Sequence, residues 1–558
     1  MTVSIRRVAA AFTFSTLALA CAGAVAKPVV IYNIKGYGFD DKRQLVSFSQ
    51  LAFDDESGKV LARGDKLDPK FHQATHIDGK NRTLLPGLID GHGHVLGLGE
   101  NLSRVELRDS TSEAQAVAKV AAFAKTQPQA QWIQGRGWNQ VLWPTRQFPS
   151  KTLLDEAVKD KPVWLSRVDG HAGWANSAAL KIAGITKDTL DPDGGQIVRD
   201  ANGEPTGVLI DNAMVLLEKH IPKSSEAERQ AQLKLAYEHL LSLGITSTHD
   251  AGIDAANLAS YQSMQAQQQL PVRIYAMLAA TDPNLPQWLK QGPMDDPKDM
   301  LDVRSVKIYG DGALGSRGAA LLAPYADKPG ETGLLVTQPD ALTAQMKAIT
   351  AAGFQANVHA IGDRANRLVL DRFEQLLTPA QREAGRHRIE HAQIVSPKDL
   401  HRFAVLKVLP SMQPTHATSD KNMASDRLGV ARLRGAYAWR SLVDDGNRIV
   451  GGSDYPVELA NPFYGIHAAV TRQDQQNQPE GGWLPEQKLT LTEALRAFTV
   501  DAAYGAYQEK AMGSLQVGSW ADFILIDRDI YQVPPEQLWQ TKVLATYVGG
   551  TLKFPFSQ

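Results

Sequence analysis

The stretch PGLIDGHGH, from Pro86 to His94, is the starting point because it joins a short apolar run to two histidines one residue apart. Residues i and i+2 of a β-strand face the same way, so His92 and His94 would present both imidazoles to one side. The intervening Gly93 lets another backbone approach closely. A polar loop can carry the same letters, so the rest of the chain must decide whether this is a metal-binding strand end.

Seven further strand-like runs follow, and longer helical segments alternate with them. This alternation is typical of βαβ units and a parallel sheet. Eight strands is the number that closes a (β/α)₈ barrel, so we predict that fold. The predicted strands are Leu84–Asp90, Ile245–Asp250, Val272–Leu278, Val303–Tyr309, Ala356–His359, Arg388–His391, Val408–Gln413 and Arg448–Asp454.

The interval from about residue 91 to 244 is far longer than the others, which predicts an inserted subdomain at about 100–235. Both ends of the chain contain short β-branched runs broken by glycine, with no helical period. Chain ends often lie together, so residues 27–83 and 507–558 are expected to form one small β-sandwich domain. The barrel would then occupy residues 84–506, including the insert.

Four more of the predicted strands have an ionisable residue embedded in or just closing the apolar run: Lys307, His359, His391 and Asp454. Barrel enzymes place their active sites at the carboxyl ends of the strands. A charge in or next to an apolar run is costly unless it is paired or bound to metal. Each residue alone would be interpreted as a satisfied core histidine or a helix cap. Five strand ends that all supply nitrogen or oxygen ligands predict a metal site.

Composition narrows the class of protein. The chain has 558 residues, 59 Lys plus Arg and 60 Asp plus Glu, for a net charge of −1. Such a balance offers no field that would attract nucleic acid or an anionic membrane, so a small-molecule partner is expected. The chain contains a single cysteine, which excludes a disulfide framework. No run reaches the roughly 18 apolar residues of a membrane span.

The N-terminus is typical of a secretory signal peptide over residues 1–26. It has Arg6 and Arg7, an apolar run from Val8 to Leu19, and a small-x-small site that ends at Ala26. Cleavage there predicts a periplasmic or secreted protein; a lipid anchor on Cys21 is the less favoured alternative. Since Cys21 leaves with the signal, the mature chain would have no thiol for catalysis or metal binding.

These motifs together resemble the amidohydrolase superfamily. PGLIDGHGH is its signature, and the long insert, VKIYGDGALGSRGAAL and GGSDYPV resemble its third family, amidohydrolase family 3. That branch includes N-substituted formamide deformylases. The resemblance covers essentially the whole mature chain. It implies a metal-dependent barrel with a β-sandwich built from both chain ends, which hydrolyses C–N bonds of non-peptide or small acyl amides.

The resemblance also implies roles for the strand-end residues. His92, His94 and Asp454 would hold a more buried metal, His359 and His391 a more exposed one. Lys307 would bridge the two divalent ions as a carbamate formed with CO₂, which requires a neutral lysine. A ligand set of imidazole and carboxylate suits Zn²⁺, with Mn²⁺, Fe²⁺ or Ni²⁺ as alternatives. A shared water would become the nucleophile, with Asp454 as general acid and base.

Two alternatives remain at this point. The first is deamination of a heterocycle at one metal, but deaminase branches place Glu three residues after the fifth-strand histidine, where this chain has Gly362. The second is a non-catalytic ligand-binding or regulatory protein on the same fold. A site that had lost its catalytic activity would be expected to lose metal ligands as well. All six ligand positions are filled here, which favours an enzyme.

Four further residues are candidates for substrate contact: Trp138, His171, Arg317 and His249. Trp138 and His171 lie in the insert and could supply an aromatic wall and a hydrogen-bonding imidazole. For Trp138, the competing interpretation is a packed aromatic core. For Arg317 it is a simple turn, and for His249 it is a structural role. His416 could also reach the barrel mouth from the seventh strand.

Overall fold

The computed structural model describes residues 28–140, 143–168, 170, 172–192, 195–211, 213–315 and 317–555. The predicted signal peptide, Cys21 and His171 lie outside these ranges. Within them, every helix is too short or too polar to cross a bilayer.

The centre of the molecule is a barrel of eight parallel strands in the order β19-β18-β17-β16-β15-β14-β13-β6 within the described residues. All eight predicted strands are present. Most of their residues are buried, as expected for parallel strands covered on both faces. The strands are β6 (Leu88–Gly93), β13 (Ile245–Ile253), β14 (Arg273–Ala279), β15 (Leu301–Tyr309), β16 (Gln355–Ala360), β17 (Arg388–His391), β18 (Leu409–Met412) and β19 (Val450–Gly451).

The first barrel strand begins later than predicted. Residues 84–86 end β5 (Thr75–Pro86) and pair antiparallel with β20 (Phe523–Ile526) of the terminal β domain. Gly87 then connects the two sheets, and its N–H donates to the Asp522 carbonyl at 2.8 Å. One continuous apolar run in the sequence therefore serves two sheets, which the pattern alone could not divide.

Backbone hydrogen bonds bring the last strand next to the first. The Asp454 N–H donates to the His92 carbonyl at 2.7 Å, and the His94 N–H donates to the Tyr455 carbonyl at 2.8 Å. Gly93 and Tyr455 form a parallel bridge between the two segments. Residues about 360 positions apart in sequence thus become neighbours at the carboxyl end of the barrel.

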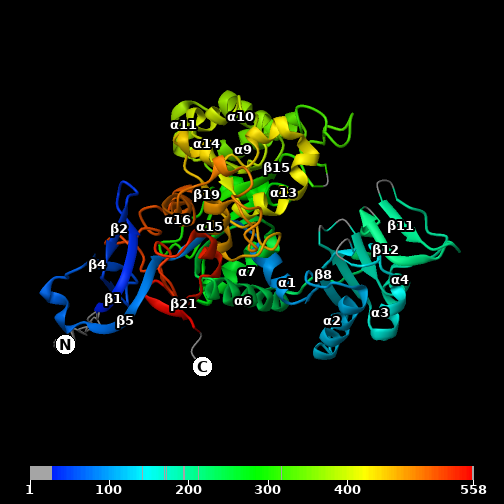
Figure 1. The fold of residues 1–558 in the computed structure, drawn as a ribbon, viewed down its shortest axis with the longest axis horizontal. Helices are drawn as coiled ribbons and strands as arrows, with labels where there is room; N and C mark the ends of the chain where they lie inside the picture. Colours follow the sequence, from blue (N-terminus) through cyan, green and yellow to red (C-terminus); the bar gives the residue numbers. More distant parts are fainter. Residues whose placement is uncertain are drawn as a thin grey trace, which may run out of the picture.

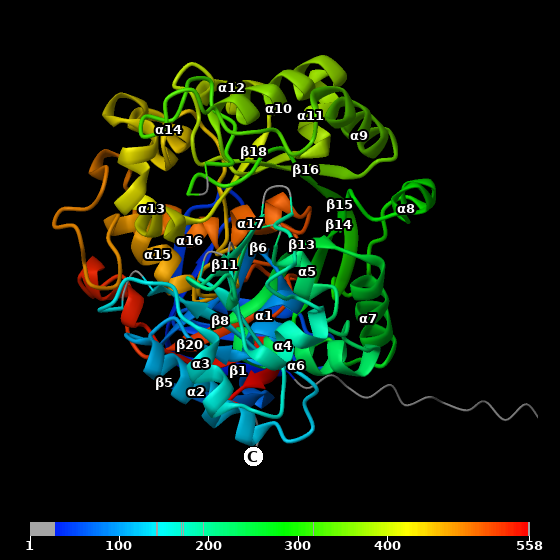
Figure 2. The ribbon, with the colours of Figure 1, turned by 90° about the vertical axis from the view of Figure 1, so that its right-hand side faces the viewer.

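Helices surround the barrel strands in a ring, as the view along the long axis shows (Figure 2). Their starts follow from sequence: Ser225 and Glu228 form a capping box at α6, and Asp254 caps α7 through the Asn257 N–H. The principal outer helices are α6 (Glu226–Ser242), α7 (Ala255–Ala266), α8 (Leu285–Gln291), α9 (Pro339–Ala351), α10 (Asp363–Leu376), α12 (Leu400–Leu406), α14 (Trp439–Asp444) and α16 (Leu491–Ala497).

Both ends of the described chain form the predicted β domain beside the barrel (Figure 1). Its strands make one continuous sheet, in which β5 and β20 join the N-terminal and C-terminal parts. A buried Arg273–Asp522 ion pair, 2.7 Å from Nε to Oδ2, links the barrel to this sheet. The strands are β1 (Pro28–Phe39), β2 (Leu45–Phe48), β3 (Gln50–Asp54), β4 (Val60–Gly64), β5, β20, β21 (Val543–Val548) and β22 (Thr551–Phe554).

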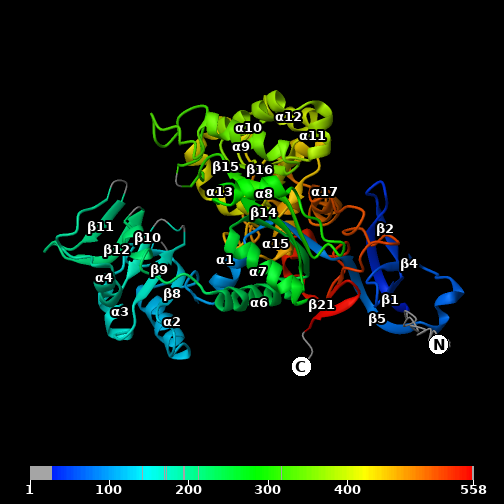
Figure 3. The same cartoon turned by 180° about the vertical axis from the view of Figure 1, so that it is seen from behind.

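The insert follows α1 (Val95–Leu102) and lies on the opposite side of the barrel from the terminal sheet (Figures 1 and 3). It contains a six-stranded sheet in the order β11-β12-β10-β9-β8-β7 and a core of its own. The strands are β7 (Val105–Glu106), β8 (Ile133–Trp138), β9 (Val163–Arg167), β10 (Ala172–Ala175), β11 (Gly195–Arg199) and β12 (Pro205–Asp211), with helices α2 (Glu113–Thr126), α3 (Lys151–Ala157) and α4 (Ser177–Ala183).

Candidate metal centre and active site

The carboxyl ends of β6, β15 and β19 bring four of the predicted ligands together. His92 Nε2 lies 3.0 Å from Lys307 Nζ and 3.6 Å from Asp454 Oδ1. His94 Nε2 lies 3.1 Å from the same Asp454 oxygen. His92 and Lys307 are almost fully buried, while His94 is partly open to the cavity. These side chains converge on one point, as the strand-end pattern predicted.

The two remaining histidines lie next to this group on β16 and β17. The ring centroid of His391 is 4.8 Å from that of His92 and 4.6 Å from that of His359. The His359 Nε2 atom is 3.5 Å from Asp311 Oδ1 and has no hydrogen-bond partner in the described part of the chain. All six predicted ligands therefore lie around one end of the barrel.

The tautomers of the β6 histidines are assigned by their partners. His92 Nδ1 lies 2.5 Å from Glu390 Oε2, and His94 Nδ1 lies 2.9 Å from the Ala251 carbonyl oxygen. Both oxygens accept, so each Nδ1 carries the proton and each Nε2 keeps its lone pair toward the cluster. Metal-binding histidines are oriented in this way by carboxylates and carbonyls. Sequence reasoning missed Glu390, although an ionisable residue within the buried run RIEH was a visible signal.

His391 has the same arrangement. Its Nδ1 lies 2.8 Å from Gln413 Oε1, which accepts a hydrogen bond from the Nδ1–H and leaves Nε2 with a lone pair. Gln413 is buried at the end of β18, and the sequence analysis did not single it out. Three imidazoles thus offer Nε2 lone pairs, and each is held by an oxygen acceptor behind it.

Burial sets the charge states of the cluster. It lowers the pKa of His92 and His391 well below the usual value, with a further contribution from neighbouring positive groups, and lowers the pKa of His359 to about 3. Burial also lowers the pKa of Lys307. Burial alone would raise the pKa of Asp454, but His94, whose Nε2 lies 3.1 Å from the carboxylate, and the nearby imidazoles bring this pKa well below the usual value. The arrangement favours neutral imidazoles at His92, His359 and His391 and an ionised Asp454.

Two residues of the cluster have unusual backbone conformations. His391 has φ 77° and Asp454 has φ 61°, both in the left-handed region. Side chains with a Cβ rarely adopt it, and such strain concentrates at functional sites. At Asp454 this turn directs the carboxylate into the barrel mouth, beside the backbone hydrogen bond to His92.

A buried carboxylate that the sequence analysis did not assign connects the segments that follow the first and the last strand of the barrel. Asp90 accepts the N–H groups of His92 and Ser453, both at 3.1 Å, and the Ser453 hydroxyl at 2.7 Å. Burial raises the pKa of Asp90 to about 7. Asp90 therefore positions the segments that carry His92 and Asp454.

A cavity of about 800 Å³ opens over the cluster. Three kinds of residue line it: the cluster itself, apolar side chains, and polar residues of the loop after β17, of α13 (Pro414–Leu428) and of the loop after β19. These are His94, Lys307, His359, His391, Asp454, Tyr309, Leu314, Ile361, Met423, Val457, Gln393, His416, Asp420, Arg427 and Glu458.

Comparison with known proteins agrees with this geometry. Residues 75–553 match the amidohydrolase family. The chain belongs to the amidohydrolase family. It is 32% identical to the putative amidohydrolase YtcJ of Bacillus subtilis over 511 residues, 89% of this chain and 95% of the relative. It is 25% identical to the N-substituted formamide deformylase of Arthrobacter pascens over 491 residues, 86% of this chain and 89% of that protein.

Solved structures give the same result. The crystal structure of an uncharacterized metal-dependent hydrolase from Pyrococcus horikoshii superimposes with a TM-score of 0.76 at 26% identity, covering 91% of this amidohydrolase and 99% of that chain. The predicted family and fold are therefore confirmed, as is the metal-dependent class.

The side chains of this amidohydrolase fit a metal ion. Ligand atoms of His92, His94 and Asp454 lie within 4.8 Å of one another, and so do those of His391, His416 and Asp454. The buried Nε2 atom of His359, which has no hydrogen-bond partner among the described residues, adds a further nitrogen donor. Imidazole and carboxylate donors without thiolate suit Zn²⁺ and neighbouring divalent metals.

Trp138 does not reach the cavity. It is fully buried in the core of the insert, where its Nε1–H donates to the Leu165 carbonyl at 2.7 Å. The rings of Trp143 and Trp174 lie against it. These surroundings match the packed Trp core and not a substrate wall. The physical reason is that the insert has to bury its own apolar face.

Arg317 and His249 also lie away from the cavity lining. The Arg317 guanidinium forms an ion pair with Asp327, 2.8 Å from Nη2 to Oδ2. His249 is fully buried below the cluster, and its Nδ1 lies 3.0 Å from Arg388. Arg388 also donates to the Gly91 carbonyl at 3.4 Å, so this pair supports the strand that carries the His-x-His motif.

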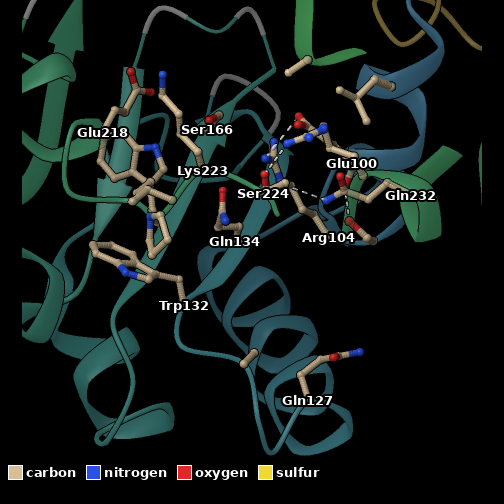
Figure 4. Close-up of a pocket in the computed structure, with 18 of the residues that line it drawn as sticks. Glu100, Arg104, Gln127, Trp132, Gln134, Ser166, Glu218, Lys223, Ser224 and Gln232 are labelled. Atoms are coloured by element: carbon tan, nitrogen blue, oxygen red, sulfur yellow. Dashed lines mark hydrogen bonds and ion pairs between the residues drawn. The ribbon is translucent and has the colours of Figure 1, made fainter. Parts of the chain in front are cut away.

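A second cavity, of about 540 Å³, lies where the insert meets the barrel (Figure 4). Glu100 and Gln232, from α1 and α6, line it together with Trp132, Gln134 and Ser166 of the insert. The Gln232 side chain donates to Ser224 at 3.4 Å. This cavity contains none of the predicted ligands, so we assign the chemistry to the cavity over the cluster.

Proposed function

We propose that this amidohydrolase hydrolyses C–N bonds of small, non-peptide amides with two divalent metal ions, Zn²⁺ being the expected metal. One observation carries the proposal: His92, His94 and His391 offer Nε2 lone pairs beside Asp454 and the buried lysine. Burying these polar groups away from water costs free energy unless a metal ion or another partner binds them.

His92, His94 and Asp454 would hold the more buried ion, and His359 and His391 the more exposed one. Lys307 would bridge them as a carbamate, which the lowered lysine pKa supports because only the neutral amine reacts with CO₂. Bound divalent ions lower the pKa of water to near neutral and polarise a carbonyl group.

The position of Asp454 suits a general acid and base. Its Oδ1 faces His94 and His92, while its Oδ2 lies on the side of His416. The lowered pKa keeps the carboxylate ionised and able to accept the proton of the attacking water. In the second half of the reaction, Asp454 would return that proton to the leaving nitrogen.

The cavity supports a small substrate with an apolar part. Leu314, Met423 and Val457 are among the residues that line it. A relative acts on N-substituted formamides, by its name. We therefore propose formamides and other small acyl amides as the first substrates to test.

Deamination has weaker support because of the local packing after β16. A deaminase would be expected to have Glu three residues after His359, where this chain has Gly362. A Cβ added to Gly362 would lie 2.0 Å from the Ala320 carbonyl oxygen, so a side chain has no room there without a backbone shift.

A hydrolysis screen tests the proposal. The purified protein would be incubated with p-nitroformanilide, p-nitroacetanilide, N-acyl amino acids, dipeptides and lactams, with and without 1,10-phenanthroline. We expect chelator-sensitive release of amine that Asp454→Asn abolishes, with an unchanged circular dichroism spectrum as the folding control. Binding of these amides without turnover would instead support a non-catalytic ligand-binding protein.

We further propose that the protein is exported after cleavage behind Ala26. N-terminal sequencing of the periplasmic or secreted fraction should give a chain that starts at Lys27. Recovery of the protein with Arg6 and Arg7 still present, in the cytosolic fraction alone, would contradict export.

A further inference from the structure

His416 is a buried histidine at the cavity that the proposed roles leave unused. It lies in α13, four residues after β18, and is 7% exposed. Its Nε2 lies 3.6 Å from Asp454 Oδ2 and has no hydrogen-bond partner among the described residues. An unpartnered polar atom at this depth normally has a function, since leaving it unsatisfied is costly.

The partner of His416 differs in kind from those of the other histidines. Gln393 Nε2 lies 2.9 Å from His416 Nδ1. An amide nitrogen donates and has no lone pair to offer, so Nδ1 accepts and Nε2 carries the hydrogen. His92, His94 and His391 show the reverse, with Nδ1 donating to an oxygen. The hydrogen-bond partners therefore assign two opposite tautomers within one site.

Gln393 is itself held in place. It is 5% exposed, and its backbone carbonyl accepts the Tyr437 N–H at 2.6 Å. The Tyr437 hydroxyl oxygen lies 3.4 Å from Gln393 Oε1 and 2.5 Å from Asp420 Oδ2, and its single hydrogen is donated to one of these two oxygens. The amide oxygen therefore faces this hydroxyl, and the amide nitrogen faces His416.

We propose that His416 donates its Nε2–H to the carbonyl oxygen of the scissile amide, and that Gln393 positions it by fixing the tautomer. The inference rests on the proposed amide hydrolysis. A substrate carbon attacked beside Asp454 places its oxygen within reach of His416 Nε2, and that oxygen gains negative charge in the tetrahedral state. A preorganised donor at this point stabilises the charge, and its proton stays on nitrogen throughout.

The tautomer of His416 also decides whether this residue donates a hydrogen bond to the substrate or binds a metal ion. Distances alone would allow His416 to bind metal with His391 and Asp454. A nitrogen that carries a hydrogen has no lone pair for a metal, so His416 is a substrate contact and His391 is the ligand.

Nitrogen NMR tests the tautomer without any substrate. The metal-loaded protein would be labelled with ¹⁵N-histidine, and the His416 signals identified by their loss in His416→Phe. We expect Nε2 protonated and Nδ1 unprotonated, and the reverse in Gln393→Glu, whose carboxylate accepts from Nδ1. A protonated Nδ1 in the wild type, or an Nε2 shift typical of a metal ligand, would overturn the inference.

Kinetics with p-nitroformanilide test the contact itself. Removal of one oxyanion donor lowers kcat by roughly 10²–10³-fold, and we expect this loss in His416→Phe and Gln393→Glu with KM and metal content little changed. His416→Gln, which keeps a side-chain N–H, should recover part of the loss. Unchanged kcat in His416→Phe, or loss of metal from it, would overturn the inference. Failure of the wild type to hydrolyse any amide would count against the proposed function, while the NMR result would stand separately.

Discussion

Replacement of Glu390 by Gln tests how this centre holds its metal. The Glu390 carboxylate accepts the His92 Nδ1–H at 2.5 Å, and both residues are 0% exposed. A hydrogen bond to a charged group contributes about 1.5–3 kcal/mol net, and a neutral one roughly half as much. Glu390→Gln keeps an acceptor oxygen but loses the charge, so we expect metal binding to weaken by about 1.4 kcal/mol, or roughly tenfold.

Competition with a chromogenic zinc chelator at fixed pH measures this change directly as a dissociation constant. Glu509→Gln is the matched control, because this carboxylate pairs with Arg386 at 2.8 Å on the outside of the barrel. It should leave the metal affinity unchanged. A Glu390→Gln affinity within twofold of the wild type would refute the reasoning that Glu390 orients His92 as a ligand.

Three further predictions concern packing and charge. Trp138→Phe should lower the free energy of unfolding by about 1–2 kcal/mol through its lost Leu165 hydrogen bond, with kcat/KM unchanged; altered KM would return Trp138 to the substrate site. Asp522→Asn leaves the buried Arg273 guanidinium without its counter-charge, so urea denaturation should show a loss of about 3 kcal/mol, and a loss below about 1 kcal/mol would contradict this. Burial lowers the pKa of His387 to about 4. The unfolded state takes up a proton near pH 6.5, whereas the folded state keeps His387 neutral down to about pH 4. The contribution to stability is therefore fully present above pH about 6.5 and lost as pH falls toward 4, by about 2 kcal/mol at pH 5. The pH slope should flatten in His387→Asn; an unchanged slope would exclude this residue as the cause.

The barrel and its strand-end residues could be predicted because each signal is local. Every predicted strand is an apolar run, and every predicted ligand lies near or just past the carboxyl end of one. Barrel closure then brings His94 and Asp454 to 3.1 Å although about 360 residues separate them. The sequence did not have to specify that contact, since the fold itself provides it.

The residues that orient the ligands could not be assigned from sequence. Glu390 is visible as a charge in a buried run, but its partner His92 lies 298 positions away. Gln413 and Gln393 are ordinary amides at strand ends until their donor and acceptor atoms are placed. The insert presents a related difficulty: a stretch rich in Trp and Gly fits a substrate wall or a core, and only packing shows Trp138 among other aromatic rings.

Metal content per chain, measured by inductively coupled plasma mass spectrometry, tests the central claim most directly. The account predicts two divalent ions in the wild-type protein and a loss of most metal in Lys307→Ala, because the bridging carbamate cannot form. Arg304→Ala, on the same strand but paired with Asp295 at the surface, is the control and should keep both ions. Fewer than one ion per wild-type chain, or two ions retained in Lys307→Ala, would contradict the binuclear centre.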